Sequence, residues 1–269
     1  MITAAMPSHL PSRKVEAKLA AMDSNLTLFP EWPTGLWRRV IIQPGAGWIG
    51  GALEDDVHCF HMRLDHKNGR IVRARAAALR HPWTACPGAA PHIAGELTGA
   101  LLSEVAARDP SQHCTHLFDL AVVLAAHADD TEPTTIDMRV ADRIDERTTA
   151  TMTENGAEVM RWRLVGTELH GEGRDLRQLS QWKRELSSRD AERATMLRRA
   201  VFVSGVRQYT APAELTAAEP GSQRMGVCYN YQLPQAETST RTPNWLTDWS
   251  AGAGEPLAGL DAEKVLAAL

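Results

Sequence analysis

The sequence lacks the features that define several common classes of protein. It has no stretch approaching the roughly 20 apolar residues that a transmembrane helix requires. It has no dinucleotide-binding fingerprint, phosphate-binding loop or GxSxG serine elbow, which argues against nicotinamide-dependent oxidoreductases, kinases and typical esterases. Lysine and arginine number 29 against 33 acidic residues, a formal net charge of −4, and no basic tract is interleaved with aromatics. We therefore expect neither a membrane nor a nucleic acid as a partner.

Cysteine is also scarce, with only Cys59, Cys86, Cys114 and Cys228 in the chain. An even number permits two disulfides, but disulfide-stapled secreted domains are much shorter than 269 residues. The first thirty residues contain no apolar run of the kind that a secretory signal needs. We therefore expect free thiols and a cytoplasmic location.

The remaining composition is that of a globular protein, with 43% hydrophobic and 23% charged residues. We expect an α+β fold. An N-terminal arm (residues 1–36) should precede a core lobe (37–128), and a linker at 129–135 should lead to a second antiparallel β and helical lobe (136–269). No feature of the sequence points to a particular oligomeric state.

Two asparagine–glycine pairs predict the turns of two β-hairpins. Asn68-Gly69 and Asn155-Gly156 each lie between runs of alternating polar and apolar residues, and both residue types tolerate positive φ. Helices are expected over residues 12–22, 87–107, 114–128, 175–186, 189–209 and in the C-terminal tail, and a β-like segment over 226–233.

The segment ACPGA places Cys86 at the start of an expected helix. Pro87 suits the first helical position, which would make Cys86 the N-cap. Unpaired backbone N–H groups and the helix dipole favour an anion there, so we predict a lowered thiol pKa. Gly88 leaves room for a ligand to approach the backbone. The competing interpretation is that Cys86 is a small buried residue without a chemical role.

Cys114 repeats this arrangement, because it is expected in or just before the first turn of the next helix. His113 and His116 flank it and would titrate near neutral pH. His116 also falls on an apolar helical stripe with His127, so both histidines could instead belong to the core. Cys228 is expected in the core.

The run LEDDVHCFH carries three consecutive acids into an alternating strand. Alternation would place Glu54, Asp56, His58 and Phe60 on the core face, and Asp55, Cys59 and His61 on the other. A one-residue slip would exchange Asp55 and Asp56. A buried acid beside a histidine needs partners, and such partners perturb pKa values at functional sites.

Three motifs together resemble an uncharacterised bacterial family of domains of unknown function. They are ALEDDxHxF at 52–60, PWxxCPGA at 82–89 and CTHLxDLA at 114–121. Further segments that resemble the family are DRIDERTTA at 142–150, LRRAVF at 197–202 and GVCYNYQ at 226–232. The resemblance covers most of the chain from about Arg38 to Gln232 and implies no particular activity.

The order of elements also resembles, more distantly, the U-type iron–sulfur scaffold proteins. Cys86 in CPGA and the pair His113-Cys114 match that pattern, whereas Glu54–Asp56 stands where the scaffold proteins have a cysteine. The resemblance implies a scaffold-like core of a hairpin plus helices. With a carboxylate in place of one thiolate, the set Asp56, Cys86, His113 and Cys114 would suit zinc or a single iron better than a cluster.

Three hypotheses on function follow. We favour an enzyme of lyase or hydrolase type acting on a small molecule, with an aromatic compound as one candidate because the chain has eight tryptophans. The expected catalytic residues are Glu54, Asp55, Asp56, His58, His61, Cys86, Cys114 and His116, and the expected substrate-binding residues are Arg80, Trp83 and Gly88. The alternatives are a non-catalytic metal or iron–sulfur carrier and a structural protein with buried thiols.

Overall fold

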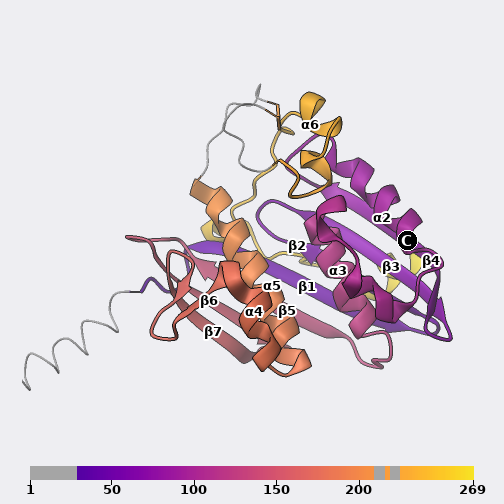
Figure 1. Ribbon diagram of the computed structural model, residues 1–269, viewed down its shortest axis with the longest axis horizontal. Coiled ribbons are helices and arrows are strands. Elements are labelled where there is room, and N and C mark those ends of the chain that lie inside the picture. The colour runs from indigo at the N-terminus through magenta and orange to yellow at the C-terminus, as the bar shows by residue number, and fades with distance from the viewer. Residues whose placement is uncertain (1–28, 209–215, 219–224) are drawn as a thin grey trace, which may run out of the picture.

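The computed structural model describes residues 29–208, 216–218 and 225–269, so the helix expected at 12–22 and most of the N-terminal arm lie outside the described residues. One antiparallel sheet, in the order β4-β3-β2-β1-β5-β6-β7-β8-β9, organises the described chain (Figure 1). Its strands are β1 (Gly35–Gly45), β2 (Trp48–Glu54), β3 (Cys59–Lys67), β4 (Arg70–Arg80), β5 (Thr134–Ala141), β6 (Arg147–Glu154), β7 (Ala157–Val165), β8 (Glu168–Leu169) and β9 (Arg174–Asp175).

The two β regions that the sequence assigns to separate lobes share this sheet. Strands β1–β4 form one meander and β5–β9 another. The pairing of β1 with β5, from Gly35 opposite Ala141 to Ile42 opposite Thr134, joins them. The α+β class is confirmed, and its central feature is a long-range strand pair.

Both predicted hairpin turns are confirmed. Asn68 and Gly69 have φ of +52° and +73°, and Asn155 and Gly156 have φ of +47° and +83°. The sequence does contain the G-x-G-x-x-G spacing of a dinucleotide-binding fingerprint, at Gly45–Gly50. These glycines lie at the turn between the antiparallel strands β1 and β2, whereas a dinucleotide-binding loop leads from a strand into a helix.

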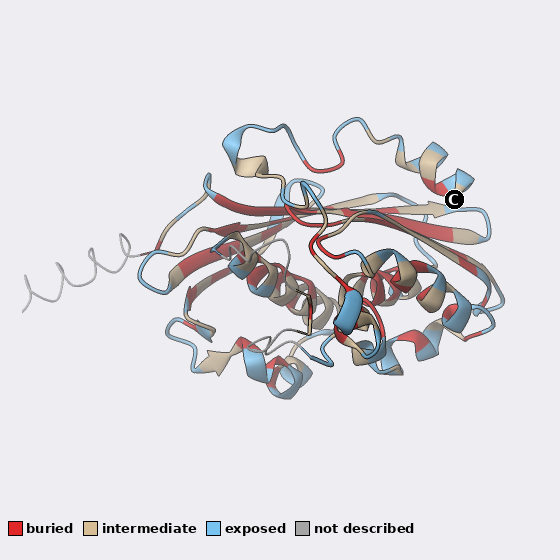
Figure 2. Cartoon of the chain, turned by 90° about the horizontal axis from the view of Figure 1, so that it is seen from above, coloured by how far each residue is buried: buried red, intermediate tan, exposed pale blue. Residues whose placement is uncertain are grey.

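Helices α2 (Ala89–Leu97), α3 (Thr115–Ala126) and α5 (Ser188–Ser204) cover one face of the sheet, and the C-terminal segment with α7 (Ala262–Ala268) crosses the other (Figure 2). Gly50 and Gly51, neighbours in β2, face opposite sides of the sheet. A Cβ on Gly50 would meet Leu266 of α7, whereas a Cβ on Gly51 would meet Leu120 of α3.

The main core lies between the sheet and these three helices. Strand residues that alternate toward the helices are almost fully buried; they include Leu36, Val40, Ile42, Phe60, Met62, Leu64, Ile136, Met138 and Val140. Each fully buried side chain of this size contributes about 1.5–3 kcal/mol of transfer free energy. The same alternation carries Arg38 into the core face, where it needs an acidic partner.

Short elements connect these parts: η1 (Cys86–Gly88), η2 (Leu102–Ala107), η3 (Pro110–Gln112), η4 (Leu176–Gln178), α4 (Leu179–Trp182), η5 (Lys183–Glu185), η6 (Gly205–Gln208), η7 (Tyr229–Tyr231), α6 (Gln235–Thr238) and η8 (Trp249–Ala251). Within the described ranges, no helix is both long and apolar enough to span a bilayer.

Three expected elements differ from the structure. The helix expected at 87–107 is interrupted by Gly99, at φ +91°, because the segment 99–100 hydrogen-bonds to Ile71 of β4. The helix expected at 175–186 is a series of short turns. The segment 226–233 forms the 3-10 turn η7 and no strand, because Tyr231 donates its N–H to the carbonyl of Cys228 within the segment.

Candidate functional site

A hollow of about 430 Å³ opens beside the start of α3. Four parts of the chain enclose it: the β2–β3 loop, the segment after β4, the C-terminal half of α5, and the segment around η7. The functional side chains in its wall are His58, Trp83, Cys86, Cys114, His116 and Cys228. Three arginines also line it, and its described lining includes no carboxylate. We call this space the hollow.

Asp55 anchors the base of this site through a dense set of hydrogen bonds. The tight β2–β3 loop turns its carboxylate inward, where Val57 and His58 donate their backbone N–H groups to Oδ1 at 2.7 and 2.8 Å. Arg38 donates Nε and Nη2 to Oδ2 at 2.9 and 2.5 Å. Burial alone would raise the pKa of Asp55, but the charge of Arg38, together with His58 and His116, outweighs it and holds the pKa well below 3.8.

The imidazole of His58 joins Asp55 to the hollow. Its Nδ1 lies 3.0 Å from Asp55 Oδ1, and its ring is part of the hollow's wall. Burial lowers the pKa of His58 below 6.5, against the opposing effect of Asp55. His58 is therefore neutral at pH 7, and an ionised Asp55 assigns its proton to Nδ1. Nε2 is then left as a proton acceptor.

The ring of His116 packs at a tilt against that of His58, with 3.8 Å between the ring centroids. Its Nδ1 lies 3.9 Å from Cys114 Sγ, and its Nε2 is buried without a hydrogen-bond partner in the described part of the chain. Burial, reinforced by His58 and Arg38, lowers the pKa of His116 well below 6.5. The arrangement is a row of two neutral imidazoles that leads from a buried carboxylate to a thiol.

The prediction of lowered thiol pKa values is wrong. Burial raises the pKa of Cys114 to about 12 although Cys114 is the N-cap of α3, as the sequence predicted. Burial and the neighbouring thiols of Cys114 and Cys228 raise the pKa of Cys86 well above 9.0. Cys86 also opens the 3-10 turn η1 and does not cap α2. Desolvation of the thiolate outweighs the favourable helix end, so both residues are thiols at neutral pH.

The other two acids of the run LEDD have different partners. The Asp56 carboxylate accepts from the backbone N–H of Trp37 at 3.3 Å and from Arg207, and among the described residues it makes no hydrogen bond with His58. Glu54 ends β2 on the opposite face from Asp55, where it accepts from the N–H of Leu257 at 2.6 Å. The loop that starts at Asp55 breaks the alternation on which the expected faces depended.

Two expected substrate-binding residues have structural contacts instead. Arg80 donates Nη2 to Glu54 at 3.1 Å and Nη1 to the Asp56 carbonyl at 2.7 Å, which holds the β2–β3 loop in place. Gly88 lies so close to Tyr229 that an added Cβ would be 2.8 Å from the hydroxyl oxygen. Trp83 does line the hollow and lies 4.2 Å below the guanidinium of Arg241.

Several candidates lie away from the hollow. His61 and Cys59 are on the face of the sheet opposite the core helices, as Glu54 is. His127 ends α3 between Asp130 and Glu192, with Nδ1 2.6 Å from the Asp130 carboxylate. His113 faces Glu96 of α2. Cys59, Cys86 and Cys114 are free cysteines in the structure.

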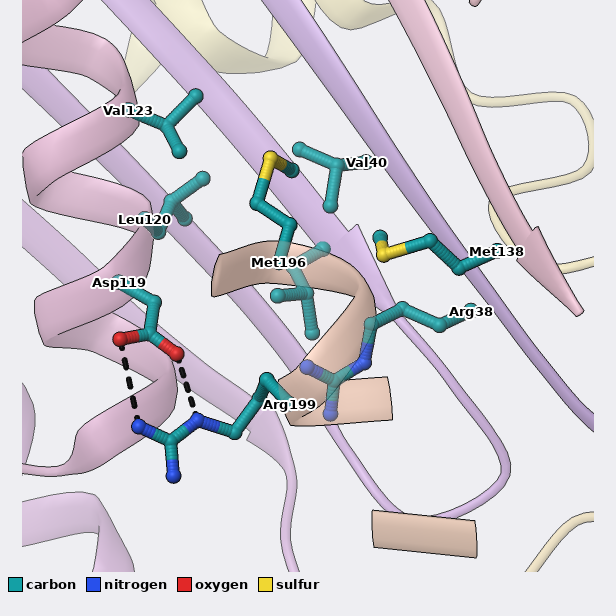
Figure 3. Close-up of a pocket in the computed structure, with 9 residues that line it drawn as sticks. Arg38, Val40, Asp119, Leu120, Val123, Met138, Met196 and Arg199 are labelled. Carbon is teal, nitrogen blue, oxygen red and sulfur yellow. Dashed lines mark hydrogen bonds and ion pairs between the residues drawn. The ribbon is translucent and has the colours of Figure 1, made fainter. Parts of the chain in front are cut away.

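Sequence reasoning missed Cys228, which it assigned to the core, and the arginines of α5. Cys228 lies in the segment GVCYNYQ at 226–232, to which the sequence had already drawn attention. Figure 3 shows Arg199 of α5 facing Asp119 of α3 beside a small cavity of about 20 Å³, with Arg38 of β1 close by. The Arg199 Nε to Asp119 Oδ2 distance is 2.6 Å. Arg199 thus borders both this cavity and the hollow.

The expected metal ligands Asp56, Cys86, His113 and Cys114 do not form a gathered set. Among the described residues, three candidate ligand atoms lie within 4.8 Å of one another only at His92, Glu96 and His113. Comparison of the sequence with models of known families and with curated proteins gives no match.

Proposed function

We propose that this protein is an enzyme that binds a small molecule in the hollow and uses His58 as its general base. The observation that supports this most directly is the hydrogen bond between the buried carboxylate of Asp55 and Nδ1 of a histidine whose ring borders the hollow. A base oriented by a third group is the arrangement that recurs in acid–base catalysis. A correctly placed base of this kind accelerates proton transfer by about 10²–10⁴-fold.

The chemistry that fits is of lyase or hydrolase type. In an elimination, His58 Nε2 would take a proton from the substrate carbon, and the electron pair of that C–H bond would form the new double bond. The bond to the leaving group would break, and the imidazolium would return the proton to that group. In a hydrolysis, Nε2 would instead take a proton from water as its oxygen bonds to the substrate's acyl carbon. The bond from that carbon to the leaving group would then break, and the imidazolium would give its proton to the leaving group. Because the thiols stay protonated, Cys86 and Cys114 serve as polar wall groups here and not as ready nucleophiles.

The walls of the hollow favour an aromatic anion as substrate. Trp83, Phe202 and Tyr231 provide flat apolar surface, and Arg198 and Arg241 provide positive charge. Arg199 also lines the hollow, where Asp119 pairs with it.

Two measurements test this function. ¹⁵N NMR of the histidine side chains at pH 7 should show His58 neutral with its proton on Nδ1. Turnover is then measured on 3-hydroxy-3-phenylpropanoate (elimination of water) and 4-nitrophenyl acetate (hydrolysis). His58→Gln should lower turnover at least about 100-fold, whereas the control His66→Gln, at the far end of β3, should not. Turnover of neither probe by the wild type, or equal turnover in His58→Gln, contradicts the proposal.

A second candidate is a non-catalytic carrier of a metal or an iron–sulfur cluster. It is supported by one observation, that Cys86, Cys114 and Cys228 from three separate segments line the same hollow. Its test is the metal and acid-labile sulfide content of protein purified without added metal. Two or more irons per chain with sulfide support the carrier, and their absence favours the enzyme. A cytoplasmic location is part of either proposal, since both require reduced thiols.

A further inference from the structure

Outside the hollow, three side chains of metal-binding type come together on α2 and at the turn before α3. His92 and Glu96 lie one helical turn apart on α2, and His113 directly precedes Cys114. His92 Nε2 lies 3.8 Å from Glu96 Oε1, and His113 Nε2 lies 3.6 Å from Glu96 Oε2. Both separations are too long for a hydrogen bond.

One nitrogen at this convergence has no hydrogen-bond partner. His92 Nε2, the atom that lies nearest Glu96, is buried without a hydrogen-bond partner among the described residues. His113 is only 2% exposed, so water has little access to its ring. A buried polar group that has no partner is costly to fold, and such a group at a convergence of ligands points to a missing partner.

We propose that His92, Glu96 and His113 bind a divalent metal ion of the zinc type. Zinc bonds of about 2.0–2.2 Å to nitrogen and oxygen place the ligand atoms of a tetrahedron roughly 3.4 Å apart. The two separations between a histidine nitrogen and a Glu96 oxygen exceed that value by only a few tenths of an ångström, and the three ligand atoms all lie within 4.8 Å of one another. Two imidazoles and one carboxylate leave a fourth position open for water.

The positive charge of Arg108 lies beside the proposed site, so a variant that removes this charge tests whether an ion binds there. Its Nη1 lies 3.6 Å from Glu96 Oε2, so its positive charge competes for the carboxylate. The side chain is 31% exposed and can turn toward solvent when an ion binds. Removing this charge should strengthen metal binding, which a purely structural Arg108–Glu96 pair would not predict.

The position of the site suggests that the ion would help to place the thiols of the hollow. His113 is adjacent to Cys114, and α2 follows directly on the turn that contains Cys86. The ring of Tyr229, next to Cys228, packs at a tilt against His92 with 5.2 Å between the ring centroids, and Tyr229 donates its N–H to the His113 carbonyl at 2.9 Å. An ion here would tie together the three segments that contribute thiols, as a positioning element outside the hollow.

The test is isothermal titration of the full chain with Zn²⁺ at pH 7 after removal of metal with a chelator. We expect one ion per chain. His92→Gln and Glu96→Gln should each weaken binding at least about tenfold, and Arg108→Gln should strengthen it. The matched control Glu132→Gln, an exposed carboxylate in the linker, should leave the affinity unchanged.

A second arm separates this site from the thiols. Cys86→Ser/Cys114→Ser should retain its zinc affinity, and the Co²⁺-loaded wild type should lack a thiolate-to-cobalt charge-transfer band. Unchanged affinity in both His92→Gln and Glu96→Gln overturns the proposal, as does loss of binding in the cysteine variant. No gain in Arg108→Gln would place the ion away from Glu96 and also overturn it. None of these outcomes depends on turnover or on His58, so they are independent of the proposed function.

Discussion

Replacing Asp55 by asparagine tests the buried ion pair on which the candidate site depends. The substitution keeps the shape of the side chain and removes its charge. Oδ1 of the asparagine can still accept from the N–H groups of Val57 and His58. Its amide NH₂ would then point at the guanidinium of Arg38, so two donors would face each other in a place where Arg38 is only 2% exposed.

The expected loss of stability follows from these contacts. Two hydrogen bonds between charged groups are lost, each contributing about 1.5–3 kcal/mol. Breaking a buried ion pair by removing one partner costs about 3–5 kcal/mol, because the other charge stays buried and uncompensated. We therefore expect Asp55→Asn to lower the free energy of unfolding by about 3–5 kcal/mol, a large part of the roughly 5–15 kcal/mol of a typical domain.

The assay is urea denaturation at pH 7, with Asp137→Asn as the matched control. Asp137 also pairs with an arginine, Arg39 at 2.8 Å, but both side chains are 17% exposed. Water can partly solvate the charge that is left, so the loss of this pair should cost less than the loss of the fully buried pair of Arg38 and Asp55. Arg38→Met and the double variant Arg38→Met/Asp55→Asn complete a double-mutant cycle, and the double variant should be more stable than the sum of the single losses predicts.

The pH dependence has a definite sign. Because the folded pKa of Asp55 is held well below 3.8, its contribution is fully present above pH of about 4 and is lost as the pH falls through the folded value. The free energy of unfolding should therefore fall less steeply with decreasing pH in Asp55→Asn than in the wild type. A cost no larger than that of Asp137→Asn, together with an unchanged acid transition, would refute the reasoning.

Three further outcomes are expected. Burial raises the pKa of Asp56 from 3.8 to about 7, so its protonated form favours folding at low pH, and this contribution is lost as the pH rises through that range. The loss of folding stability between pH 5 and pH 8 should therefore be smaller in Asp56→Asn than in the wild type. An equal loss in both proteins, measured by urea titration, contradicts this. Burial raises the pKa of Cys114 to about 12, so iodoacetamide should alkylate this thiol at pH 8 far more slowly in the native protein than in urea. Peptide mass spectrometry measures the two rates. Equal rates would show that the thiol is not desolvated. Gly51→Ala would bring a Cβ to 2.8 Å from Leu120 and should destabilise the protein by about 1–3 kcal/mol. Gly95→Ala in α2 adds a Cβ in open space and should stabilise the protein by up to about 1 kcal/mol. Thermal unfolding of both variants should shift the melting temperature in opposite directions, and shifts in the same direction contradict the packing argument.

Local features of the sequence were sufficient to predict the hairpins, helix α3 and the alternating core face of β3. A turn such as Asn68-Gly69 depends on the φ preferences of two adjacent residues. The position of Cys114 at a helix start depends on the few residues that follow it. Such interactions act between neighbours in the chain, so they can be recognised in the sequence.

The contacts that define the site act between distant residues, and only the tertiary structure decided them. The choice of Asp55 over Asp56 as the partner of His58 depends on Arg38, which reaches the loop from another strand. Cys228 joins Cys86 only because the C-terminal segment returns to the hollow. The thiol pKa values rise because burial removes water from the sulfurs, and burial is a sum over every element packed around them. Patterns of neighbouring residues in the sequence do not reveal how deeply a side chain is buried, which is why the helix-end argument predicted lowered thiol pKa values and not raised ones.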